Sequence, residues 1–120
     1  LDKAAMSLKS AMDLAKSTAI RNEFAKGMDY AASQICFDQN KKELSVHKAT
    51  AIESASCTTS IVFSYPLSQT IEIKDANSSD FKCFSFNHFG QVSTEITGNC
   101  KTNLSLKISN GSLNETNNFY

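Results

Sequence analysis

Four cysteines and two histidines carry the most reactive side chains of this 120-residue chain. The cysteines are Cys36, Cys57, Cys83 and Cys100. They are widely spaced and form no CxxC pair, and neither His47 nor His88 stands at zinc-ligand spacing from them. An even number of scattered cysteines therefore favours two disulfides, formed in an oxidising compartment, over a metal site.

Three pairings of four cysteines are open, and loop length favours one of them. Cys36 with Cys57, and Cys83 with Cys100, would each close a short loop between neighbouring strands. In the chain-entropy model each such bridge contributes about 3 kcal/mol to stability. The alternative is four buried free thiols in a cytosolic protein.

Catalytic chemistry needs a nucleophile or base with a partner that activates it. His47 falls within a strand-like alternation and His88 within a turn, and no recognisable motif surrounds either. The four glycines are not clustered, so the sequence has no glycine-rich phosphate loop. We therefore expect a protein that is not an enzyme and that needs no cofactor.

The charges are balanced, with 12 basic and 12 acidic residues. This balance argues against a protein dedicated to binding nucleic acid. The best local basic patch combines Lys41 and Lys42 with Lys48. Lysines there could contact DNA phosphates in a salt-dependent complex, and a solvated turn is the alternative.

The segment DANSSD, residues 75–80, offers alternating oxygen atoms as a calcium-binding loop does. It lacks the turn glycine and the distal glutamate of an EF-hand loop, and we interpret it as a solvated turn. Asparagine sequons begin at Asn77, Asn103, Asn110 and Asn114. In a chain so rich in Asn and Ser, most such matches are accidental.

The elements that position these residues begin with a helix. Apolar residues recur at spacings of four and three and form one stripe: Leu1, Ala5, Leu8, Met12, Ala15 and Ala19. Good helix formers fill the segment, and it contains no proline. The pattern predicts a helix from Leu1 that stops at Gly27 or, kinked there, continues to about residue 33.

From about residue 34 the apolar period changes to two. The alternating segments are QICF (34–37), ELSVHKA (43–49), TTSIVFSY (58–65), QTIEIKD (69–75), FKCFSFNHFGQVSTEI (81–96) and TNLSLKIS (102–109). Strands that follow one another without helices pair antiparallel. We predict one α+β domain over residues 1–120, with five to seven strands and a tail that is loose or an edge strand. No stretch is long and apolar enough to span a bilayer.

The order of these features resembles the type IV pilin-like proteins, and more narrowly the GspH/FimT group of minor pilins and pseudopilins. Members tend to carry a helical segment of the form L…AR-x-x-A-I-x-R-N, and residues 14–22 read LAKSTAIRN, with Lys16 where arginine is usual. They also tend to carry F-x-P-x-G, and residues 86–90 read FNHFG, without the proline.

This resemblance implies a type IV pilin-like fold and a subunit that assembles by packing. In that family the helix of the folded domain is the second half of one continuous helix. The apolar first half spans the inner membrane before assembly and packs in the filament core afterwards. A chain that begins at Leu1, in phase with a helix, is what remains when that half is removed. The resemblance therefore implies a protein of the bacterial inner membrane that faces the periplasm and later joins a filament or the cell surface.

The expected role is a tip or priming subunit of a type IV pilus or a type II secretion pseudopilus. The residues expected to contact neighbouring helices are Leu1, Leu8, Met12 and Ala15, and those expected in the core strand are Phe84, Phe86 and Gly90. Two other functions stay open. One is a DNA-binding minor pilin of a DNA-uptake pilus, acting through the lysine patch, and the other is an unrelated secreted, disulfide-bonded adhesin domain.

Overall fold

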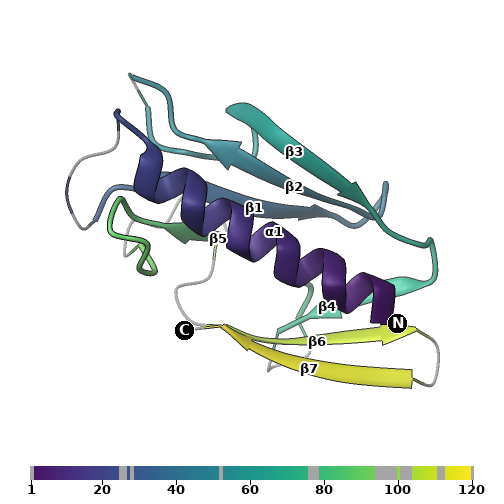
Figure 1. Ribbon diagram of the computed structural model, residues 1–120. Helices are drawn as coiled ribbons and strands as arrows, with labels where there is room; N and C mark the ends of the chain where they lie inside the picture. Colours follow the sequence, from purple (N-terminus) through teal and green to yellow (C-terminus); the bar gives the residue numbers. More distant parts are fainter. Residues whose placement is uncertain are drawn as a thin grey trace.

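The computed structural model describes residues 2–24, 27, 29–51, 53–75, 79–93, 100, 104–110 and 113–119. The elements are helix α1 (Asp2–Arg21) and strands β1 (Ser33–Asp38), β2 (Glu43–Lys48), β3 (Ser60–Pro66), β4 (Ile71–Lys74), β5 (Cys83–Phe86), β6 (Leu104–Asn110) and β7 (Leu113–Phe119). One N-terminal helix packs on antiparallel strands, which is the predicted α+β arrangement (Figure 1). Within the described residues, no helix has the length and apolar content needed to cross a membrane.

The strands form two antiparallel sheets. A four-stranded sheet has the order β3-β2-β1-β5, and a three-stranded sheet has the order β4-β6-β7. Figure 1 shows α1 lying along the four-stranded sheet, with the three-stranded sheet below the N-terminal part of the helix. The tail of the chain was predicted to be either loose or an edge strand. It forms β7, at the edge of the three-stranded sheet.

The apolar stripe of α1 holds both sheets to one core. Its buried residues are Ala4, Leu8, Ala11, Met12, Ala15 and Ala19. They belong to one cluster with apolar side chains of β1, β2 and β5 in the first sheet and of β4 and β6 in the second. The Ser33 hydroxyl, at the start of β1, donates to the carbonyl of Ala15 and fastens the helix to the sheet. Most of the helix's stability thus comes from tertiary packing.

Helix α1 ends at Arg21, earlier than either predicted end. The next residue, Asn22, is fully buried and bonds outside the helix. Its Nδ2 donates to the carbonyl oxygens of Ala32, at 2.8 Å, and Ala49, at 3.3 Å. Its Oδ1 accepts from the N–H of Phe24 at 3.0 Å. These bonds turn the chain out of the helix and tie its end to the sheet.

The segment predicted to extend the helix is part of the sheet's hydrogen bonding instead. The N–H of Ala32 donates to the carbonyl of Phe86 at 2.8 Å, and the carbonyl of Ala31 accepts from the N–H of Ala55 at 2.8 Å. Gly27 has a φ of +91°, in the left-handed region. Tertiary hydrogen bonds therefore override the high helix propensity of these alanines.

Both disulfides of the favoured pairing are present. Cys36 is bonded to Cys57, with 5.9 Å between their Cα atoms, and Cys83 to Cys100, with 4.5 Å. Each bridge fixes a loop to a strand of the four-stranded sheet, since Cys36 lies in β1 and Cys83 in β5. The predicted disulfide connectivity is confirmed.

The Phe-rich segment forms β5 and then a tight turn. Asn87 is buried, and its Oδ1 accepts from the N–H groups of Phe89 and Gln91, each at 3.0 Å. Gly90 has a φ of +76°. It lies under the side chain of Ile20, so the turn packs against the C-terminal part of α1. Gly90 therefore belongs to this turn and not to the core strand in which it was expected.

Replacing Gly90 with alanine is expected to lower the free energy of unfolding by about 1–3 kcal/mol. The backbone is left-handed, and the added methyl group would lie 2.9 Å from Cδ1 of Ile20. Gly27→Ala is the matched control, because Gly27 also has a positive φ but has no atom within 4 Å of the new methyl. Urea denaturation measures both losses. A larger loss in Gly90→Ala would come from the contact with Ile20, and no loss in either variant would contradict the left-handed backbone at the two glycines.

Candidate functional site

Strand β3 is an exposed apolar edge of the four-stranded sheet. The strand order places it at the margin, paired only with β2. Ile61, Val62 and Phe63 are 62%, 41% and 53% exposed. None of the seven residues from Ser60 to Pro66 is charged. Edge strands usually carry charges that discourage association, so this edge is suited to contact with another molecule.

The register with β2 shows which way this edge faces. Phe63 and Tyr65 lie opposite Val46 and Leu44, whose side chains are in the core with α1. The rings of Phe63 and Tyr65 pack edge-on, with centroids 4.8 Å apart. The register shifts between Val46 and His47, so Val62 has no partner on β2. Phe63 therefore lies on the face of the sheet that carries α1, whereas Ile61, opposite His47, lies on the other face, so the strand exposes apolar side chains on both faces.

A further aromatic residue extends this apolar region. Phe24, just after α1, is 48% exposed, and the Lys48 ammonium lies 5.8 Å from its ring centroid. Lys48 is opposite Ser60, the first residue of β3. Phe24 is thus connected to the β2–β3 pair through the side chain of Lys48. We refer to Phe24, Ile61, Val62 and Phe63 as the β3 surface.

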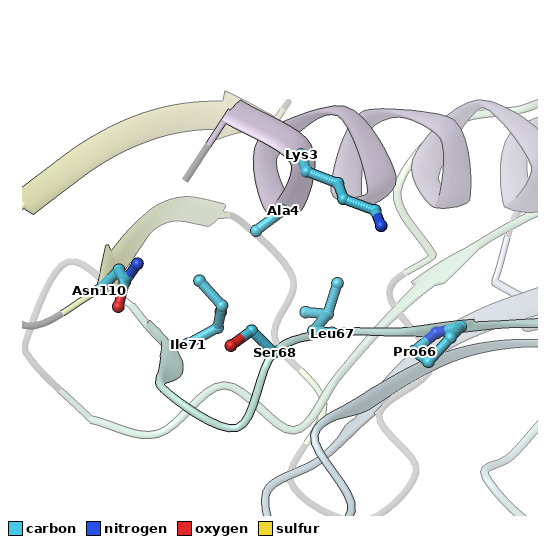
Figure 2. A pocket seen from close by; sticks show the side chains of 7 residues that line it. All are labelled: Lys3, Ala4, Pro66, Leu67, Ser68, Ile71 and Asn110. Carbon is cyan, nitrogen blue, oxygen red and sulfur yellow. The ribbon is translucent and has the colours of Figure 1, made fainter.

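A groove of about 380 Å³ lies where the first turn of α1 meets the β3–β4 connection (Figure 2). Its lining residues are Lys3, Ala4, Pro66, Leu67, Ser68, Ile71 and Asn110. Most of the wall is apolar, and Figure 2 shows Lys3 and Asn110 on different sides of it. Pro66 is the last residue of β3, so the groove begins where this strand ends.

The lysines predicted to form one basic patch are separated. Lys41 and Lys42 lie in the turn before β2, and Lys48 is the last residue of that strand. A strand rises about 3.3 Å per residue, which puts Lys48 about 20 Å from Lys42. The Lys48 ammonium also makes a cation–π contact with the ring of Phe24. The three lysines therefore do not form one compact patch, and contact of these lysines with DNA phosphates stays a prediction.

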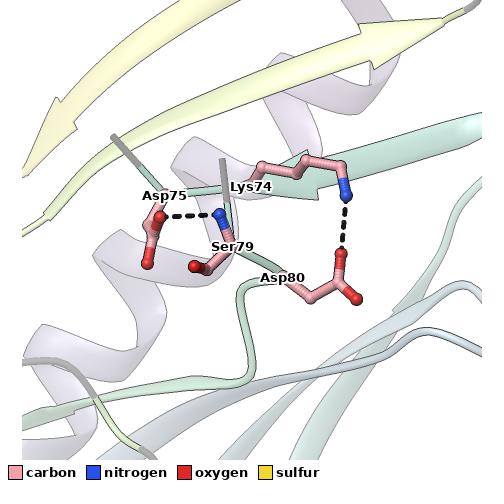
Figure 3. A network of polar contacts seen from close by, with 4 residues as sticks. All are labelled: Lys74, Asp75, Ser79 and Asp80. Atoms are coloured by element: carbon pink, nitrogen blue, oxygen red, sulfur yellow. Dashed lines mark hydrogen bonds and ion pairs between the residues drawn. The ribbon is translucent and has the colours of Figure 1, made fainter. Parts of the chain in front are cut away.

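Lys42 belongs instead to a charge cluster around Asp80. Lys74 Nζ lies 2.8 Å from Asp80 Oδ1 (Figure 3). This hydrogen bond and the Lys74 charge lower the pKa of Asp80, with smaller contributions from Lys42 and Lys82. Nearby, the carboxylate of Asp75 accepts from the N–H of Ser79 at 3.0 Å and closes the segment predicted as a solvated turn.

That segment does not assemble a cation site among the described residues. Searched over the part of the chain that the structure describes, no group of three or more His, Cys, Asp or Glu could hold a metal ion. Of the sequons, Asn77 and Asn103 lie outside the described residues, and Asn110 lines the groove.

Replacing Lys74 with alanine is expected to raise the pKa of Asp80 toward its ordinary value of 3.8. A carboxyl whose pKa is lowered in the folded state stabilises the fold above its unfolded pKa, and this contribution is lost as the pH falls through the folded pKa. Both side chains are exposed enough for salt to screen the pair. An NMR titration of Asp80 measures the shift, and an unchanged pKa in Lys74→Ala would contradict the pairing.

The residues predicted for helix contacts are in the protein's own core. Leu8, Met12 and Ala15 are buried against the sheets, and Leu1 lies outside the described residues. Phe84 and Phe86 are also buried, as expected for a core strand. The three helix residues therefore serve the fold of this chain and are not available to another molecule.

His47 is buried on the face of β2 turned away from α1. Its Nδ1 lies 3.0 Å from the carbonyl of Thr59, and its Nε2 lies 2.8 Å from the hydroxyl of Ser45. A carbonyl can only accept, so Nδ1 carries a proton, and a neutral ring then accepts from Ser45. The contacts account for both ring nitrogens and hold the β2–β3 loop on the sheet.

Replacing Lys41 and Lys42 together, or Lys48 alone, with alanine is expected to leave binding to duplex DNA unchanged within about twofold, because a chain with 12 basic and 12 acidic residues has little overall attraction for phosphates. Fluorescence anisotropy at about 50 mM and about 200 mM salt measures this. A salt-sensitive complex that is lost in Lys41→Ala/Lys42→Ala would overturn the expectation and favour the DNA-uptake alternative.

No family model, curated protein or solved structure matches the chain. The candidate site is thus built from the geometry alone. Sequence reasoning missed the β3 surface, because three consecutive apolar residues such as those at 61–63 usually indicate a buried strand. It also gave Asn22 no role of its own.

Proposed function

We propose that this chain is an assembly subunit of a type IV pilin-like filament, in the manner of a minor pilin or pseudopilin. The observation that carries the proposal is the way α1 packs lengthwise on antiparallel sheets through one apolar stripe. A helix held along its length is a rigid element through which a folded domain can be joined to a larger helical assembly.

Asn22, the last residue of the segment that resembles the GspH/FimT helical motif, supports the proposal. Residues 14–22 resemble the helical motif of the GspH/FimT group, and the last of them is Asn22. Its side chain donates to the carbonyls of Ala32, which directly precedes β1, and Ala49, which directly follows β2. An asparagine at this position fixes the angle between helix and sheet, which a subunit packed through its helix requires.

Contacts with neighbouring subunits would come from exposed side chains. The helix stripe is used internally, so the β3 surface is the better candidate for the contact between folded domains. The two disulfides suit a domain that works outside the cytoplasm. The resemblance further implies an anchoring apolar helix ahead of Leu1 and a place in the inner membrane before assembly.

Shearing filaments from cells that express the full-length protein tests this function. Immunoblots should detect the chain in the filament fraction, and Ile61→Ser/Phe63→Ser should lower that signal severalfold at an equal cellular level. Phe89→Ser is the matched control, because Phe89 is also an exposed apolar residue but lies in the turn after β5 and outside α1.

Two results would count against the proposal. A chain that is absent from filaments and found as a free secreted protein would favour the adhesin alternative. If the chain is in filaments and Ile61→Ser/Phe63→Ser assembles as well as Phe89→Ser, the filament function stands and the role of the β3 surface is rejected.

A further inference from the structure

The four cysteine sulfurs gather at one place on the four-stranded sheet. Cys36 in β1 lies directly opposite Cys83 in β5. Cys36, Cys83 and Cys100 form one buried cluster. Since Ile35 packs in the core with α1, the alternation of β1 puts Cys36 on the opposite face. The two disulfides therefore lie side by side on the face turned away from the helix.

The fourth cysteine is accessible. Cys57 lies in the loop between β2 and β3 and is exposed, whereas its partner Cys36 is buried. Thiol–disulfide exchange begins when a thiolate attacks a sulfur that it can reach. An external thiol therefore meets Cys57 first, and Cys36 is the sulfur that leaves.

A buried amide connects the two bridges. Gln34 Oε1 lies 3.4 Å from Cys36 Sγ and 3.3 Å from Cys57 Sγ. Its Nε2 donates to Cys100 Sγ at 2.9 Å and to Ser85 Oγ at 2.8 Å. An N–H that points at a sulfur favours the negatively charged form of that sulfur. Cys100 is thus the better leaving group of the second disulfide.

The geometry also permits a direct bond between Cys36 and Cys83. Residues opposite each other on antiparallel strands have Cα atoms about 4.5–5.5 Å apart. Disulfides span Cα separations of about 4.4–6.8 Å. The Cys36–Cys83 bridge can therefore form by a change of side-chain rotamers, without movement of the backbone.

We propose that the two disulfides form a single exchange site for external thiols, entered at Cys57. The incoming thiolate bonds to Cys57 Sγ, the Cys36–Cys57 bond breaks, and its electron pair goes to Cys36. The Cys36 thiolate then bonds to Cys83 Sγ, the Cys83–Cys100 bond breaks, and Cys100 leaves as a thiolate that takes a proton from water. One external thiol has entered and one internal thiol has been released, so no oxidant is needed.

Limiting reduced glutathione tests the proposal on the folded protein. After acid quenching and alkylation with N-ethylmaleimide, trypsin and Glu-C separate the four cysteines, because cleavage at Lys82 and Glu95 divides the Cys83 peptide from the Cys100 peptide. The expected product carries glutathione on Cys57, N-ethylmaleimide on Cys100 and a Cys36–Cys83 cross-link. Alkylation at Cys36 with the Cys83–Cys100 bridge intact would overturn the proposal.

A variant separates the second step from the first. Cys57→Ser leaves Cys36 as the initial free thiol, and alkylation should move with time from Cys36 to Cys100. Adding Gln34→Leu should slow the appearance of the Cys100 thiol by roughly tenfold, since it removes one hydrogen bond to a charged sulfur. A thiol that stays on Cys36 in Cys57→Ser would reject the internal transfer.

Discussion

Replacing Phe84 with alanine is expected to lower the free energy of unfolding by about 3–5 kcal/mol. Phe84 is fully buried in β5, and its ring meets that of Phe86 edge-on, with 5.1 Å between centroids. It belongs to the cluster that joins α1 to both sheets. Truncation therefore removes buried apolar area and leaves a cavity that the surrounding elements fill only in part. Chemical denaturation followed by circular dichroism measures the loss.

Phe89→Ala is the matched control for this loss. It removes the same atoms from an exposed position in the turn after β5. The expected change is within about 0.5 kcal/mol, as for most surface substitutions. Similar losses for the two variants would contradict the central place of Phe84 in the core. The denaturant slopes should agree with that of the unmodified protein, so that the comparison rests on the same unfolding transition.

Replacing Asn22 with alanine is expected to lower the free energy of unfolding by about 2–4 kcal/mol. The side chain is fully buried and serves three backbone groups: the carbonyls of Ala32 and Ala49 and the N–H of Phe24. Alanine would leave these groups without this partner, and the cost of unsatisfied buried polar groups exceeds the net value of the bonds themselves. Urea denaturation measures the change.

Two further variants of asparagine residues sharpen this test. Asn22→Asp replaces the donating amide with oxygens that face two carbonyls, so the loss should be larger at neutral pH than at a pH low enough to protonate the carboxyl. Asn40→Ala is the control, because Asn40 is exposed and donates through its backbone N–H alone to Asp38. A loss in Asn22→Ala no larger than in Asn40→Ala would contradict the assigned role of Asn22.

The strands with one face on the helix were predictable from the sequence. In β2, Leu44 and Val46 alternate with polar residues because their face packs on α1, and the strand lies within the predicted segment. The disulfide pairing was also predictable, since short loops limit which cysteines can meet. Both features depend on short-range spacing, which a sequence shows directly.

The end of α1 was not predictable in the same way. Two of the bonds of Asn22 reach residues 10 and 27 positions later in the chain. Local propensity favours continuing the helix through the alanines that follow, and only the folded sheet supplies the competing partners. The helix boundary is therefore a tertiary property.

The exposure of the β3 surface differs from what a run of apolar residues usually predicts. Three consecutive apolar residues usually indicate a strand buried on both faces. Here the strand order leaves β3 at the edge of the sheet. The register shift leaves Val62 without a partner on β2 and so interrupts the alternation of the two faces along β3. Lys41 and Lys42 likewise stand at the other end of β2 from Lys48, although the three are close in sequence, and phosphate binding by them stays a prediction.

The mature N-terminus of the native full-length protein tests the central claim, that this domain is a filament subunit joined through its helix. Intact-mass and N-terminal sequencing should find an apolar segment that starts about 25–30 residues before Leu1, as the resemblance implies, with an N-methylated first residue and a glutamate a few residues on. A mature protein that begins near Leu1 and is released as a free chain would contradict the claim.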